Sequence, residues 1–159
     1  MDSQQIELIG RNRLVSELLE AKLEVARPER DHGIDLIVYA EKPKFVAVPI
    51  QMKAASKKSF SLSKKYAEFP NLILAYIWNL EKGQTPATYA LTYVEALAVV
   101  EEMGWDQTPS WQEKGGYGTT KPGKRILKLL QPYLMSPDKW REKVTGTLCR
   151  QDGLLQKTT

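Results

Sequence analysis

Three polar side chains that could do chemistry together lie on two neighbouring hydrophobic segments. Asp35 belongs to the segment at 34–39, and Gln51 and Lys53 lie near the end of the segment at 45–53. Both segments are rich in β-branched residues, which predicts strands. Because side chains alternate between the two faces of a strand, Gln51 and Lys53 share one face. A carboxylate, an amide and an amine on such a face are costly to bury unless they pair with one another or hold an ion.

The break between these strands contains Pro43 and predicts a hairpin centred there. That centre places Asp35 opposite Gln51, and opposed side chains on one face lie within roughly 5–8 Å of each other at Cβ. Two interpretations stay open at this point: an exposed ion pair between Lys53 and Asp35, or a functional site. Pro49 cannot donate a ladder hydrogen bond, so we expect a bulge at this position.

The remaining elements follow from hydrophobic spacing and turn residues. We expect a helix at 5–22, strands at 24–27, 34–39, 45–53, 72–78 and 88–92, a crossover helix at 56–69, a helix at 94–103 and closing helices at 125–134 and 137–144. The segment 72–78 is apolar throughout, which is typical of a strand covered on both faces. The opposite face of the hairpin is apolar and is expected to face a core; it consists of Ile34, Leu36, Val38, Val46, Val48, Ile50 and Met52. The predicted fold class is α/β, with a mixed central sheet in α-β-β-β-α-β order, flanking helices and a small helical C-terminal part.

Length and composition indicate one ordinary globular domain. The chain has 159 residues, of which 42% are hydrophobic and 26% charged. We expect a single domain at 1–145, with a core at about 5–104, a helical extension at 105–145 and a polar tail at 146–159. Cys149 is the only cysteine and His32 the only histidine, which excludes a disulfide framework and a histidine-based metal or nucleophile site. The chain start has no secretory pattern, and the longest apolar run is far short of the roughly 20 residues of a membrane span, so we expect a cytoplasmic protein.

The positive charge is concentrated in one part of the sequence. The formal net charge is only +4, but seven lysines and no acidic residue lie between positions 42 and 65. This segment is either a solvated face or a contact surface for phosphates, which position nucleic acid without reading its sequence. Lys57, Lys58, Lys64 and Lys65 directly follow the strand that carries Lys53 and are the stronger candidates. Lys121, Lys124 and Arg125 interleave with aromatic residues, which fits either nucleic-acid binding or ordinary packing.

The stretch Gly33-Ile-Asp35-Leu-Ile-Val, followed by Ile50-Gln51-Met52-Lys53, resembles the PD-(D/E)XK nuclease superfamily. It is similar to the variant of Mrr-like restriction enzymes, in which glutamine replaces the acidic residue before X-K. The resemblance covers about residues 5–100 and includes the preceding helix and the order of the elements. It implies a restriction-endonuclease-like core and a metal-dependent endonuclease that hydrolyses phosphodiester bonds in DNA. The alternative is a catalytically inactive module on the same fold that binds nucleic acid or another protein.

The resemblance also implies a role for each matching residue. Asp35 would be the principal ligand of Mg²⁺ or Mn²⁺, with the Gln51 amide oxygen and the Met52 backbone carbonyl as further donors. Lys53 would orient or deprotonate the attacking water and offset charge on the phosphate. A glutamate of the first helix often joins such a site; Glu17 is the first candidate and Glu7 the second, although either fits a solvated helix position equally well. The expected partner is nucleic acid, with DNA favoured; no membrane contact is expected, and a homodimer stays open.

Overall fold

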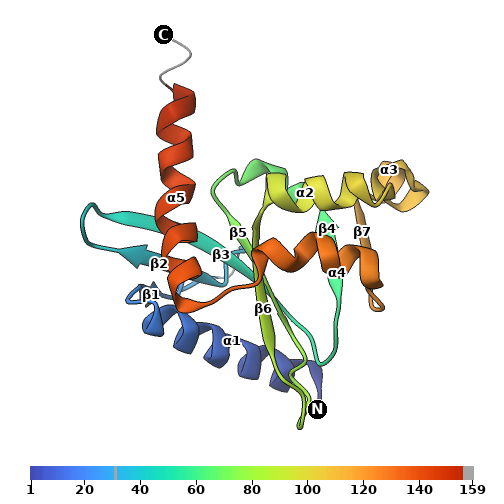
Figure 1. The fold of residues 1–159 in the computed structure, drawn as a ribbon, viewed down its shortest axis with the longest axis horizontal. Coiled ribbons are helices and arrows are strands. Elements are labelled where there is room, and N and C mark those ends of the chain that lie inside the picture. Colours follow the sequence, from blue (N-terminus) through green and yellow to red (C-terminus); the bar gives the residue numbers. More distant parts are fainter. Residues whose placement is uncertain (31, 156–159) are drawn as a thin grey trace.

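The computed structural model describes residues 1–30 and 32–155, with side chains through Gly146 (Figure 1). Its helices are α1 (Ser3–Glu20), α2 (Tyr93–Glu102), α3 (Pro109–Lys114), α4 (Lys124–Leu130) and α5 (Pro137–Leu155). Its strands are β1 (Glu24–Ala26), β2 (Leu36–Ala40), β3 (Val46–Ala54), β4 (Phe60–Ser63), β5 (Ile73–Trp78), β6 (Ala87–Thr92) and β7 (Gly116–Thr119). Short 3-10 turns cover Lys64–Glu68, Trp105–Gln107 and Gln131–Tyr133.

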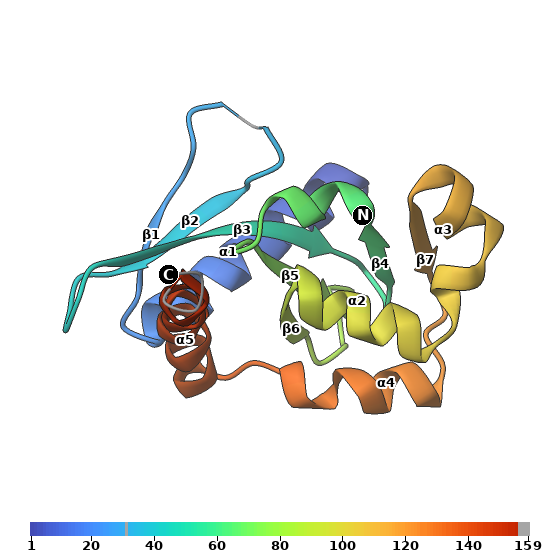
Figure 2. The ribbon, with the colours of Figure 1, turned by 90° about the horizontal axis from the view of Figure 1, so that it is seen from above.

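The centre of the fold is a mixed five-stranded sheet in the order β1-β2-β3-β5-β6. β3 pairs with β2 in antiparallel fashion and with β5 in parallel, and β6 closes the sheet antiparallel to β5. Strands β4 and β7 form a separate two-stranded sheet (Figure 2). The predicted α/β class with a mixed central sheet and flanking helices is confirmed.

Two hydrophobic cores lie on the two faces of β5, because all six of its residues are buried. Ile73, Ala75 and Ile77 face the core that α1 and α5 cover, and Leu74, Tyr76 and Trp78 face the core built with β4, α2, α3 and α4. This arrangement explains the uninterrupted apolar run, since successive side chains of one strand enter different cores. The predicted strand covered on both faces is confirmed.

The hairpin of β2 and β3 has the predicted register, from Leu36 opposite Ile50 to Ala40 opposite Val46. Its buried face packs on the α1 and α5 core, as expected. Ile34 is an exception: it precedes β2 and packs against the opposite core, because strand alternation does not extend to it. The expected bulge at Pro49 is also wrong. Pairing with β2 is unbroken there, and pairing with β5 starts only at Ile50, so one side of Pro49 lacks a strand partner.

The predicted crossover helix at 56–69 is wrong. Phe60 and Leu62 are buried and alternate with the half-exposed Ser61 and Ser63, which is the period of a strand. This strand, β4, pairs with β7, which lies between the expected helices at 94–103 and 125–134, where no strand was predicted. At the other end of the extension, α4 is shorter than expected and continues as a 3-10 turn. Helix α5 begins at Pro137 as predicted and continues through the expected tail to Leu155, and residues 156–159 lie outside the described part.

Gly10 lets α1 approach β3 closely just before the end of that strand. A Cβ at Gly10 would lie 2.7 Å from the Ala54 Cβ and 3.2 Å from Leu80 Cδ1. Gly146, inside α5, has no atom within 4 Å of the corresponding position. Gly10 and Gly146 therefore form a matched pair of helix-interior glycines.

Gly10→Ala is expected to lower the free energy of unfolding by up to about 2 kcal/mol, because an overpacking cost of typically 1–3 kcal/mol outweighs the roughly 1 kcal/mol that alanine contributes to a helix. Gly146→Ala is expected to raise it by up to about 1 kcal/mol. Urea denaturation of both variants measures the difference. An equal increase in the free energy of unfolding for both variants would show that α1 has room for a Cβ beside Ala54.

Candidate active site

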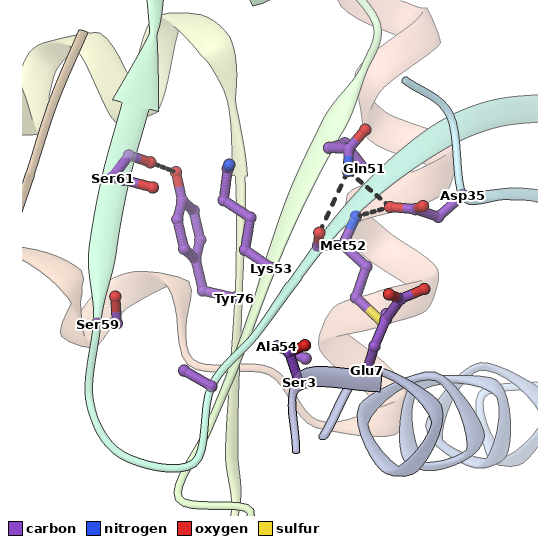
Figure 3. Close-up of a pocket in the computed structure, with 11 residues that line it drawn as sticks. Ser3, Glu7, Asp35, Gln51, Met52, Lys53, Ala54, Ser59, Ser61 and Tyr76 are labelled. Carbon is purple, nitrogen blue, oxygen red and sulfur yellow. Dashed lines mark hydrogen bonds between the residues drawn. The ribbon is translucent and has the colours of Figure 1, made fainter. Parts of the chain in front are cut away.

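A pocket of about 520 Å³ opens where β3 ends, and it contains the predicted polar cluster (Figure 3). Asp35, Gln51, Met52 and Lys53 line it from the hairpin. The start of α1 contributes Ser3 and Glu7, the segment leading into β4 contributes Ser59 and Ser61, and β5 contributes Tyr76. Both parts of the sequence motif, Asp35 and the stretch from Gln51 to Lys53, therefore line one concave site. Ligand-binding sites usually have this shape.

Asp35 is fixed by hydrogen bonds to the adjoining end of β3. Its Oδ2 atom accepts hydrogen bonds from Gln51 Nε2 at 2.7 Å and from the Met52 backbone N–H at 2.6 Å. Its own backbone N–H donates to the carbonyl of Ile50 at 2.9 Å. The expected proximity of Asp35 and Gln51 is found, although Asp35 lies just before β2 rather than inside it. A half-buried carboxylate held in this way has a defined orientation in the pocket.

Gln51 presents its amide nitrogen to Asp35. The same nitrogen lies 3.3 Å from the Met52 carbonyl oxygen, and the Gln51 oxygen faces Gly33, whose φ is +86°. A carboxylate oxygen and an amide oxygen are both acceptors, so they repel each other unless a cation or a proton lies between them. The Gln51 amide must therefore rotate before its oxygen and Asp35 can bind one metal ion.

Lys53 extends from β3 between Tyr76 and Gln51 (Figure 3). Its Nζ lies over the ring of Tyr66, 5.2 Å from the centroid. Among the described residues no ion pair joins Lys53 to Asp35, so the simple ion-pair interpretation of the cluster is wrong. Its amine is held by an aromatic ring and stays available to an anion in the pocket.

Tyr76 forms a wall of the pocket beside Lys53, opposite which it lies in the parallel register of β3 and β5. Its hydroxyl donates to the Ser61 carbonyl at 2.7 Å, and its ring stacks on Phe60. Burial, and secondarily the neighbouring Tyr66, raises the pKa of Tyr76 above its ordinary value of 10.0. The hydroxyl stays protonated near neutral pH, so Tyr76 is not a general base there. The sequence did not indicate that Tyr76 lies beside Lys53, because the parallel register of β3 and β5 depends on the entire connection between these strands.

Glu17, the first candidate for a helix carboxylate, does not line the pocket. It accepts hydrogen bonds from Thr88 Oγ1 at 2.8 Å and Trp140 Nε1 at 3.2 Å and pairs with Arg13 at 3.1 Å, so it links α1 to β6 and α5. Glu7, the second candidate, lines the pocket and pairs with Arg11. The two glutamates are ten residues apart, which is about 15 Å along a helix, so they do not share one site. Gly10 marks where α1 meets β3 and could have indicated the glutamate one turn before it.

The predicted basic residues separate into three groups. Lys57, Lys58 and Lys121 line a second pocket of about 480 Å³, which shares Ser3, Ala54, Ala55 and Ser59 with the first. Lys64 Nζ lies over Trp111 and Lys65 Nζ over Tyr66. Lys124 is exposed at the start of α4, and Arg125 donates to the Glu102 carbonyl at 2.7 Å and pairs with its carboxylate. The β4–β7 pairing brings Lys121 to the pocket of Lys57 and Lys58. Because this pairing joins distant segments of the chain, the proximity of these lysines was not evident from the sequence.

The pocket offers oxygen donors that suit one hard divalent cation. They are the Asp35 and Glu7 carboxylates, the Gln51 amide and the Met52 carbonyl. Within the described residues, no group of three or more His, Cys, Asp and Glu side chains is placed to hold a metal. Two carboxylates and two neutral oxygens would leave a bound cation with several water ligands, as Mg²⁺ prefers, rather than in a closed protein cage.

Comparisons with known proteins give a similarity in structure but none in sequence. No protein-family model and no curated protein matches the chain. The fold is similar to the structure of a bacterial homing endonuclease, I-Ssp6803I, over 99% of this chain and 98% of that one, with a TM-score of 0.46 and 13% sequence identity. Because this similarity is weak, the functional proposal below rests on the pocket.

Across the described part of the chain, none of the helices combines the length and the apolar character needed to cross a membrane. The cytoplasmic location and the homodimer stay predictions.

Proposed function

We propose that this protein is a metal-dependent nuclease that cleaves phosphodiester bonds in DNA, with a site of the PD-(D/E)XK type in its glutamine variant. The observation that carries the proposal is the contact of Asp35 with Gln51 and with the Met52 N–H at the end of β3, in a pocket that Lys53 also lines. A carboxylate, an amide and an amine on adjoining strands supply the groups that metal-assisted phosphodiester hydrolysis requires.

Each residue has a separate task in the proposed reaction. Asp35 and Gln51, with the Met52 carbonyl, would hold Mg²⁺ or Mn²⁺, which supplies Lewis acidity at the scissile phosphate. Lys53 orients the attacking water and offsets the negative charge that develops on the phosphate. Tyr76, fixed by Ser61, packs beside Lys53 and limits the positions that its amine can take. Glu7 lies at the opposite wall, where it can orient a water molecule.

The second pocket supports a polymeric substrate. Lys57, Lys58 and Lys121 surround it, and it shares a wall with the pocket of Asp35. Phosphates flanking the scissile bond would occupy this basic pocket, which positions the strand without reading its bases. Binding of this kind weakens as salt increases.

A non-catalytic nucleic-acid-binding module is the second candidate, and one contact favours it. Asp35 Oδ2 accepts the Met52 N–H at the point where β3 extends beyond its pairing with β2. A carboxylate in that position has a structural role even without a metal, because it satisfies a backbone donor. The cleavage assay separates the two candidates.

The test is cleavage of a panel of linear, supercoiled, branched, methylated and single-stranded DNA with Mg²⁺, with Mn²⁺ and with EDTA. We expect metal-dependent cleavage by the wild type, and Lys53→Gln is expected to reduce the single-turnover rate by about 10²- to 10³-fold, because one charge-stabilising donor is lost. Lys128→Gln, an exposed change on α4, removes the same charge elsewhere and is expected to leave the rate unchanged.

DNA binding without metal-dependent cleavage, across the whole panel, would favour the binding module. Cleavage that Lys53→Gln does not slow would remove Lys53 from the mechanism.

A further inference from the structure

Two lysines from separate elements share one aromatic ring beside the pocket. Lys53 Nζ of β3 is 5.2 Å from the centroid of the Tyr66 ring, and Lys65 Nζ of the following 3-10 turn is 5.1 Å from the same centroid. Tyr66 is only 5% exposed, so its ring is fixed in the core. The two ammonium groups therefore lie at most about 10 Å apart, a separation set by one ring, although the sequence gives no reason to pair them.

Such an arrangement is suited to an anion. The ring attracts each ammonium group but does not neutralise either of them, and the two positive charges repel each other. A phosphate whose oxygens contact both groups offsets this repulsion and gains two charge-assisted hydrogen bonds. Lys65 is exposed and Lys53 lines the pocket, so a substrate can reach both.

The neighbouring Lys64 has a different environment. Its Nζ lies 5.3 Å from the centroid of the Trp111 ring of α3, and its backbone N–H donates to the Gly115 carbonyl at 2.8 Å. Lys64 thus packs at the junction of α3 and β7. Two consecutive lysines, equivalent in sequence, therefore differ in whether they share a ring with Lys53.

We propose that Lys65 binds the scissile phosphate together with Lys53, with Tyr66 as the ring that holds both amines. Lys65 thereby acts in the chemical step, whereas Lys64 acts at most on the affinity for the DNA backbone. This inference rests on the proposed nuclease function for its kinetic consequence, but the anion site itself can be tested without cleavage.

The kinetic test compares Lys65→Gln, Lys65→Arg and Lys64→Gln, with Lys128→Gln as the charge control. Lys65→Gln is expected to lower kcat by about 10- to 100-fold, because one donor to the phosphate is lost, while the Kd for uncleaved DNA in EDTA changes much less. Lys65→Arg is expected to restore most of kcat, and Lys64→Gln to change the Kd rather than kcat. Equal kcat values for Lys65→Gln and Lys64→Gln in a wild type that cleaves would overturn the inference and leave the nuclease proposal intact.

The second test uses inorganic phosphate and no DNA. Lysines are acylated with an amine-reactive ester in phosphate or in chloride of equal ionic strength, and the extent at each lysine is read by mass spectrometry. Phosphate is expected to protect Lys53 and Lys65 by about threefold or more and to leave Lys64 at its chloride level, because one anion contacts both amines. In Lys65→Gln the protection of Lys53 should fall. Protection of Lys53 that does not depend on Lys65 contradicts the shared site, whether or not the protein cleaves DNA.

Discussion

Asp35→Asn is expected to reduce metal-dependent DNA cleavage by about 10³-fold or more, because it removes the only charged ligand proposed from the hairpin. Asparagine keeps an oxygen that can accept the Met52 N–H, so the end of β3 retains that hydrogen bond. The measurements are single-turnover cleavage rates in Mn²⁺ and calorimetric titration of Mn²⁺ into the protein. Both the rate and the heat of metal binding are expected to be lost.

The matched control is Asp138→Asn, an exposed carboxylate in the first turn of α5. It makes the same change of charge and is expected to affect neither metal binding nor cleavage. An Asp35→Asn protein that unfolds more easily yet cleaves DNA at the wild-type rate would show that Asp35 acts only as a cap for β3.

Glu17→Ala is expected to lower the free energy of unfolding by about 2–4 kcal/mol, because it leaves two buried donors without a partner and each typically costs 1–3 kcal/mol. These donors are Thr88 Oγ1 and Trp140 Nε1, whose residues are 3% and 0% exposed. Glu17→Gln is expected to cost less, since one amide oxygen still accepts. Urea denaturation, followed by tryptophan fluorescence, measures both variants.

Cleavage per folded molecule distinguishes this structural role from a catalytic one. It is expected to be the same for Glu17→Ala and wild type at a temperature where both are folded. Glu20→Ala, on the exposed end of α1, is the control and is expected to change stability by no more than about 0.5 kcal/mol. A lower cleavage rate in Glu17→Ala, with no change in the free energy of unfolding, would show that Glu17 has a catalytic role.

The hairpin and its polar face could be predicted because their determinants are local. Alternating burial and a break at Pro43 set the register of β2 and β3, and that register brings Asp35 to Gln51. The pairing of β4 with β7 depends on chain segments far apart in sequence, and the alternation of Phe60 and Leu62 with serines was too short to indicate a strand alone. The crossover was therefore predicted as a helix.

Contacts that depend on how elements pack could not be read from the sequence. Lys53 lies beside Tyr76 only because β5 pairs with β3 in one parallel register. Likewise, Glu7 and Glu17 are both reasonable on α1 until Gly10 fixes where the helix meets Ala54. The residues that bear the proposed chemistry were identifiable, whereas the residues that hold them in place were not.

The two-stranded sheet of β4 and β7 fixes the separation between the proposed catalytic pocket and the basic pocket that contains Lys121. β4 follows the loop of Lys57 and Lys58, and β7 ends at Thr119, opposite Phe60, two residues before Lys121. A Cβ at Gly118 would lie 2.9 Å from the Ser61 Cβ, so these strands fit together in one alignment. Displacing the pairing by one residue would move Lys121 by about 3.3 Å relative to the pocket. In the proposed nuclease, the distance from the bound backbone to the scissile bond would be set by strand alignment rather than by the pocket.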